Sequence, residues 1–126
     1  MTETLRILAA ALLCMALCAC DLQTPKLASA GVTIYQAGQP LRSWQLSAAQ
    51  ITSLEAWLSE HRTGWTPDGV TYVPRVFVAA TGIDGSPWGI NVLGTVVVVA
   101  GGSVQLKQSF RRQDVDSLVA AIGVSL

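Results

Sequence analysis

The stretch VTYVPRVFVAATGIDGSPWGINVLGTVVVVAGGSVQLKQSF, residues 70–110, decides the fold. It contains four runs rich in β-branched and aromatic residues, which favour strands over helices. Turns containing glycine separate the runs, which cover residues 70–81, 88–93, 96–100 and 104–110. Connections this short join only antiparallel neighbours, so the stretch predicts a β-meander.

Two of the four runs carry a more specific expectation. Pro74 lacks the N–H that a ladder hydrogen bond needs, which predicts that run 70–81 is an edge strand or contains a bulge. Residues 96–99 are all valine, without polar alternation. This run is therefore expected to be a central strand that is covered on both faces.

The region before the meander predicts a hairpin. Residues 32–36 and 41–46 are strand-like, and between them lies a turn at 37–40 that contains Gly38 and Pro40. The small residues at 27–31, just before this hairpin, favour a linker.

A helix is expected next, over residues 47–63. Ser47 and Gln50 have the spacing of a capping box, in which each side chain accepts a hydrogen bond from the other residue's backbone N–H. Gly64 offers a left-handed stop at the other end. Between them apolar residues recur at helical spacing, and the resulting stripe consists of Ile51, Leu54, Trp57, Leu58 and His61.

A second helix is expected after the meander. Asp114 and Asp116 suit the positive end of a helix dipole, and Gly123 supplies a stop, with Val124 placed to pack back on Val119. The apolar spacing comes from Val115, Leu118, Val119 and Ile122. The complete order, β-β-α-β-β-β-β-α, predicts an α+β domain in which two helices pack on an antiparallel meander sheet.

The amino-terminal segment has the pattern of an export signal. Residues 7–19 carry no charge, follow Arg6 and end at the small residue Ala19. The run is shorter than the roughly 20 residues that a membrane-spanning helix requires, but it has the length of a signal-peptide core.

The end of this segment, Leu17-Cys18-Ala19-Cys20, resembles the lipobox of bacterial lipoproteins. The resemblance implies that the Cys20 thiol carries diacylglycerol, that the signal is cut between Ala19 and Cys20, and that the new amino terminus is acylated. Cys14 and Cys18, the other two cysteines, are not preceded by a small residue and do not fit as acceptors. An ordinary secretory signal that is cut elsewhere is the alternative.

The resemblance divides the chain into three parts. Residues 1–19 are the signal peptide, 20–31 the lipidated terminus with a short tether, and 32–126 a single periplasmic domain. Fully extended, the tether from Asp21 to Gly31 reaches at most about 35 Å. Because two or more acyl chains anchor a protein stably, the domain is expected to remain close to the membrane.

The membrane itself is predicted from Asp21. An Asp directly after the lipidated cysteine resembles the retention signal of the inner membrane, and a location in the outer membrane stays open. The covalent lipid on Cys20 is the only prosthetic group expected, and no dissociable cofactor is predicted.

Charge argues against a nucleic-acid partner. The chain has eight basic and eight acidic residues, and its formal net charge is zero. The one basic pair in the domain, Arg111-Arg112, does not form the stripe that a nucleic acid would require.

The sequence contains little that points to catalysis. His61 is the only histidine, and no thiol remains after the signal is cut, so no metal site is predicted. No serine stands in the G-x-S-x-G elbow of hydrolases. Since His61 lies on the apolar stripe of the first helix, a packed or capping histidine is the preferred interpretation, and the chain is not expected to be an enzyme.

Four tryptophans are the remaining unusual feature. Trp57 belongs to the helical stripe and is expected in the core, whereas the position of Trp44 is not determined. A candidate binding surface consists of Trp65, Tyr72, Arg75 and Trp88, because aromatic residues and arginine dominate binding hot spots. Aromatic residues packed beneath loops are the alternative.

Three functions therefore stay open. The preferred hypothesis is a non-catalytic lipoprotein that binds an envelope protein, either as an inhibitor or immunity factor or as an accessory of an envelope complex. The first alternative is a peptidoglycan or glycan binder that uses the tryptophans, and the second is a small hydrolase that uses His61. The partner and the oligomeric state cannot be read from the sequence.

The lipobox assignment leads to a direct test. Replacing Cys20 by serine removes the only acceptor that fits, so we expect C20S to lose metabolic labelling with palmitate. Labelling is measured on the immunoprecipitated protein, with Cys14→Ser as the matched control that should still incorporate lipid. Labelling of C20S at the wild-type level would contradict the lipoprotein assignment.

Overall fold

The computed structural model describes residues 20–125 and has the expected α+β architecture. The strands and helices follow in the predicted order, with one additional short strand, β3, after the first helix. Their bounds are β1 Leu27–Gln36, β2 Gln39–Gln45, α2 Ala48–Glu60, β3 Thr66–Pro67, β4 Val76–Gly82, β5 Pro87–Leu93, β6 Val96–Gly101, β7 Val104–Ser109 and α3 Arg112–Ala121.

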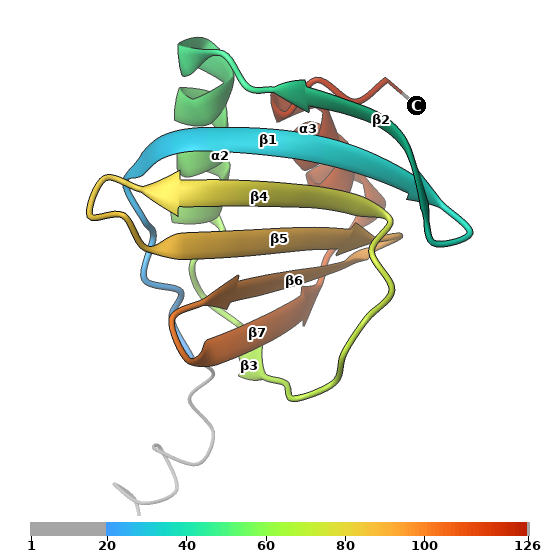
Figure 1. Cartoon of the computed structure of the whole chain (residues 1–126). Coiled ribbons are helices and arrows are strands. Elements are labelled where there is room, and N and C mark those ends of the chain that lie inside the picture. The colour runs from blue at the N-terminus through green and yellow to red at the C-terminus, as the bar shows by residue number, and fades with distance from the viewer. Residues whose placement is uncertain (1–19, 126) are drawn as a thin grey trace, which may run out of the picture.

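The seven strands form one antiparallel sheet in the order β2-β1-β4-β5-β6-β7-β3. β4 to β7 are the predicted meander, and the β1–β2 hairpin is confirmed as its continuation across the β1–β4 pair. Both helices lie on the same face of the sheet, behind it in the view of Figure 1. The other face, which we call the open face, carries no helix.

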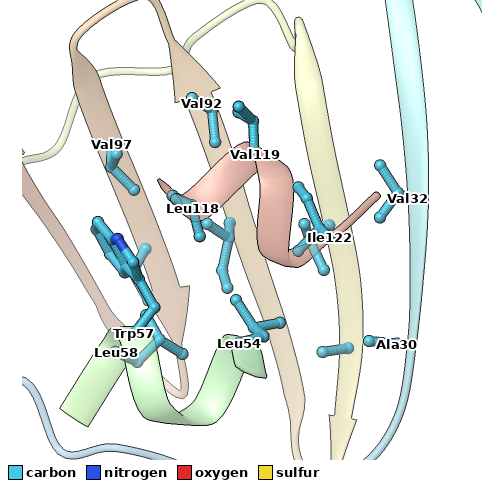
Figure 2. Packing of buried hydrophobic residues seen from close by; sticks show 14 of the residues in the cluster. Ala30, Val32, Leu54, Trp57, Leu58, Val92, Val97, Leu118, Val119 and Ile122 are labelled. Atoms are coloured by element: carbon cyan, nitrogen blue, oxygen red, sulfur yellow. The ribbon is translucent and has the colours of Figure 1, made fainter. Parts of the chain in front are cut away.

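The core lies between the sheet and the two helices. Side chains of β6, β5 and β1 point toward α2 and α3 in Figure 2, where Leu54 and Leu118 lie at the centre. Both leucines have no exposed surface. Every second residue of a strand points to the same face, so alternate residues of each strand contribute to the core. These sheet residues include Ala30, Val32, Val78, Ile90, Val92, Val97, Val99 and Leu106.

The start of α2 is confirmed and its end is earlier than predicted. Ser47 caps the helix, and the capping box is complete: the Gln50 N–H donates to Ser47 Oγ and the Ser47 N–H donates to Gln50 Oε1. The helix ends at Glu60 rather than at 63. The chain turns away there, because the Arg62 carbonyl accepts a hydrogen bond from the Leu22 N–H on the amino-terminal segment.

The carboxyl end of α3 has the predicted geometry. The Val124 N–H donates to the Val119 carbonyl and the Gly123 N–H to the Ala120 carbonyl, which is the Schellman pattern. Gly123 has a φ of 83°, the left-handed conformation that the motif requires. Only Asp114, and not Asp116, lies in the first turn.

Two expectations about the strands are wrong. Residues 27–31 are not a linker but the first half of β1, where Ala30 pairs with Ala80 and Leu27 is buried. Pro74 does not create an edge or a bulge, because β4 begins only at Val76 and pairs on both sides. Small residues are compatible with a strand whose neighbours pack closely, and Pro74 simply precedes the ladder.

The expectation for the valine run is confirmed. In β6, Val97, Val98 and Val99 are all buried, although Val98 points to the open face. The segment 68–75, which leads from β3 to β4, lies over this part of the open face: the Asp68 N–H donates to the Gln105 carbonyl and Gln105 Nε2 to the Val70 carbonyl.

Among residues 20–125, no helix has both the length and the apolar character needed to cross a membrane.

The capping box gives a quantitative expectation for stability. Ser47→Ala removes the oxygen that accepts the Gln50 N–H, so the free energy of unfolding should fall by about 1 kcal/mol. Urea denaturation of residues 20–126 measures the change. Ser53→Ala, at an exposed position inside α2, is the matched control and should be neutral or slightly stabilising. Equal midpoints for the wild type and S47A would contradict the role of this cap.

Candidate functional site

The predicted lipid-attachment residue, Cys20, is the first residue that the structure describes. Its side chain is exposed, but its backbone is paired with Trp65 as an isolated antiparallel bridge. The Cys20 N–H donates to the Trp65 carbonyl at 2.8 Å, and the Trp65 N–H donates to the Cys20 carbonyl at 3.2 Å. The Cys20 side chain is therefore accessible to solvent, whereas its main chain is hydrogen-bonded to the folded domain.

The residues that follow Cys20 do not form a free tether. Leu22 is only 4% exposed and is part of the core cluster, and its N–H donates to the Arg62 carbonyl. The Leu27 N–H donates to Glu55 Oε2 on α2, and β1 begins at the same residue. The extended tether of 20–31 is thus replaced by a segment that is held at both ends.

Cys20 is attached to α2 through a cluster of four aromatic rings. Trp65 contacts Phe110 edge to face with centroids 5.5 Å apart, Phe110 contacts Trp57 in the same way at 5.1 Å, and the His61 ring stacks on Trp57 at 4.2 Å. Trp65 also donates its indole N–H to the His61 carbonyl at 2.7 Å. These contacts hold Trp65 in place, and with it the backbone that pairs with Cys20.

His61 occupies the structural position that its place on the apolar stripe indicates. Its Nδ1 lies 2.8 Å from the Trp57 carbonyl, which only accepts, so Nδ1 donates. Its Nε2 lies 3.7 Å from Asp114 Oδ1. The Arg111 side chain donates to Asp114 and holds the pKa of this carboxyl below its usual value. Both ring nitrogens therefore face acceptor oxygens within the protein, and neither faces a nucleophile.

The four residues of the predicted binding surface do not come together. Trp65 has no exposed surface, so its assignment to a binding surface is wrong. Trp88 is half-buried on the helix face, where its ring lies against Gly101. Tyr72 and Arg75 belong to the segment 68–75 on the open face. Strand alternation explains this separation, because Trp88 lies in β5 in line with the buried Ile90.

All four indole N–H groups are used inside the protein. Trp44 donates to the Ile122 carbonyl, Trp57 to the Asp114 carbonyl, Trp65 to the His61 carbonyl and Trp88 to the Ser86 hydroxyl. The tryptophans therefore connect helices and turns by hydrogen bonds within the protein. This agrees with the alternative interpretation, in which the aromatic residues pack beneath loops.

Tyr72 also has a structural partner. Its hydroxyl donates to Asp68 Oδ2, and the Lys107 ammonium lies 3.9 Å from the same oxygen. The hydrogen bond from Tyr72 is the main cause of a lowered pKa at Asp68, whose side chain is only 6% exposed. Asp68 is consequently ionised at neutral pH, which does not suit a general acid, and the pair holds the segment 68–75 in place.

The exposed part of the open face is a band of small residues. Gly31, Ala79, Gly89 and Ala100 are paired side by side across β1, β4, β5 and β6. A side chain at Gly89 would meet the Phe77 ring at 3.0 Å, so this glycine lets the ring lie flat on the sheet. Two shallow hollows adjoin this band: one of about 170 Å³ is lined by Phe77 and Gly89, and one of about 180 Å³ by Gly31 and Ala79.

A larger hollow lies at one end of the open face, between the β1–β2 turn and the segment 68–75. Its volume is about 660 Å³, and we call its lining the distal surface: Tyr35, Gln36, Ala37, Gly38, Val73, Pro74 and Arg75. Val73 is 69% exposed, although it is a large aliphatic residue. Of the residues predicted for binding, Arg75 alone lies here.

Sequence reasoning missed Tyr35 and Val73. Tyr35 falls in a predicted hairpin strand whose facing the sequence does not determine, and Val73 falls inside a predicted strand that in the structure begins only at Val76. The signal that was available is Pro74, which has no N–H to donate and is therefore excluded from the middle of a ladder, so the strand can begin after it and leave Val73 unpaired.

The described residues contain no group of three or more His, Cys, Asp or Glu side chains that could bind a metal ion.

No family model matches the chain, and the comparisons with curated proteins and with solved structures found no match.

Proposed function

We propose that this protein is a lipid-anchored lipoprotein of the bacterial envelope, and that it binds a protein partner without catalysing a reaction. Its anchor is the lipid on Cys20, and its partner-binding region is the distal surface. The anchor rests on the lipobox resemblance, and the binding region rests on the shape and residue types at that end of the sheet.

The surroundings of Cys20 are compatible with the proposed modification. Alkylation requires an accessible sulfur, and the Cys20 side chain is exposed. Acylation of the new amino terminus keeps one N–H, because an amide replaces the peptide bond to Ala19. The hydrogen bond from Cys20 to the Trp65 carbonyl therefore survives the proposed processing.

The distal surface has the features of a protein-binding site. Its hollow is open, and its lining includes an exposed aliphatic residue, Val73, together with an aromatic residue, Tyr35, and an arginine, Arg75. Aromatic residues and arginine are enriched at the energetic centres of protein interfaces. The observation that carries the proposal is that these residues lie at the β1–β2 turn end of the sheet. Cys20 lines a cavity with Gly101 and Val104 at the opposite end, so a membrane anchor leaves the distal surface accessible.

The two alternatives have less support. A glycan binder was inferred from the tryptophans, but Trp57 and Trp65 are buried and all four indole N–H groups have partners within the protein. A hydrolase was inferred from His61, but both nitrogens of that ring face acceptor oxygens of the protein.

Site-specific crosslinking in intact cells tests the proposed binding region. A photo-crosslinking amino acid at Val73 should yield a discrete adduct with one envelope protein. The same amino acid at Ala56, which is exposed on the outer side of α2, is the matched control and should yield none. The charge-reversing substitution Arg75→Glu should remove the adduct at position 73.

Circular dichroism of the purified proteins checks that the variants at positions 56, 73 and 75 are folded. An adduct of equal yield at positions 56 and 73, or no adduct at position 73 in a folded and membrane-bound protein, would contradict the proposal.

A further inference from the structure

The end of the sheet near Cys20 carries two large aliphatic side chains that are mostly exposed. The β4–β5 and β6–β7 turns lie together at this end, because Trp88 at the start of β5 pairs with Gly101 at the end of β6. Ile83 in the first turn is 71% exposed, and Val104 beside the second is 52% exposed. The Ile83 N–H donates to the Lys26 carbonyl, so this turn is tied to the segment that follows Cys20.

An apolar cavity of about 250 Å³ opens beside Cys20 at the same end. Cys20 and Val104 both line it, and its remaining apolar wall comes mainly from Leu22, Trp88, Val99 and Leu106. We call Cys20, Ile83, Val104 and this cavity the anchor end. The side chains that carry charge nearby are of both signs, Asp21 and Asp84 against Lys26, so no charge of a single sign dominates the surface around Ile83 and Val104.

No flexible linker separates Cys20 from the folded domain. Cys20 exchanges two backbone hydrogen bonds with Trp65, and Leu22 is buried two residues later. A lipid on Cys20 therefore cannot move away from the domain as it would on a long tether, since such motion requires both contacts to break. The surface that surrounds Cys20 is held at the position of the lipid.

From this geometry we propose that the anchor end rests on the lipid bilayer and that the domain is held in one orientation. The proposal depends on the lipidation of Cys20 that is proposed above. Ile83 and Val104 contact the acyl-chain boundary beside the anchoring lipid, as apolar side chains of interfacial proteins do. The β1–β2 turn and the distal surface then point away from the membrane, because they lie at the opposite ends of the same strands (Figure 1).

Fluorescence quenching in vesicles tests the orientation. The mature lipidated protein is purified from membranes and reconstituted in phosphatidylglycerol–phosphatidylcholine vesicles that contain lipids with brominated acyl chains. The probe is bimane, attached to cysteine in either Val104→Cys or Val73→Cys, two exposed valines at opposite ends of the sheet. Lipidated Cys20 has no free thiol, so each variant carries one label.

Quenching at position 104 should exceed quenching at position 73 by at least about twofold, because only the first position lies at the acyl-chain boundary. Insertion of Gly-Ser-Gly-Ser-Gly-Ser between Asp21 and Leu22 lengthens the connection, and it should bring the ratio toward one while the lipid is retained. Equal quenching at the two positions in the protein without the insertion would overturn the orientation.

Mass spectrometry of Cys20 separates this outcome from failure of the proposed anchor. A lipidated protein with equal quenching overturns the orientation alone. A protein without lipid on Cys20 overturns the proposed function, and the orientation with it.

Discussion

Burial of one sheet face beneath two helices is the interaction on which the rest of this structure depends. Leu54 of α2 and Leu118 of α3 have no exposed surface, and they meet the aliphatic side of the sheet (Figure 2). Because strand residues alternate between faces, this contact determines what remains on the other side. The open face carries no helix: a band of small residues crosses it, and the segment 68–75 lies over part of it.

The same packing determines where the amino-terminal segment lies. Trp57 projects from the buried side of α2 and meets Phe110, which in turn meets Trp65. Trp65 is thereby fixed in position with its backbone free to pair with Cys20. A single line of contacts thus connects the hydrophobic core with the residue that we propose carries the lipid, so the anchor and the domain behave as one body.

Much of this fold was predictable from the sequence, for reasons that lie in local chemistry. Ser47 and Gln50 accept hydrogen bonds from each other's backbone N–H groups. The short glycine-containing turns of the meander join only antiparallel neighbours. Both features depend on residues that are close in the sequence. Residues 27–31 were misjudged because their strand is stabilised by pairing with β4, about fifty residues away in the sequence. The composition of residues 27–31 does not reveal that a distant strand pairs with them.

The candidate site was less predictable for the same reason. Residue type alone suggests Trp65 as a surface residue, whereas the structure packs its ring against Phe110, which follows β7 and is distant in the sequence. The predicted attachment residue, Cys20, was found from a local motif, but the pairing that removes its tether is again long-range.

The central claim is that the chain is folded from its first mature residues, which leaves the proposed anchor without a tether. Hydrogen–deuterium exchange on the lipidated protein in vesicles tests this claim most directly, with the backbone amide of Leu22 as the observable. The account predicts that this amide exchanges as slowly as amides of the sheet, because it donates to the Arg62 carbonyl and lies in the core. Exchange of Leu22 at the rate of an unstructured peptide would contradict it.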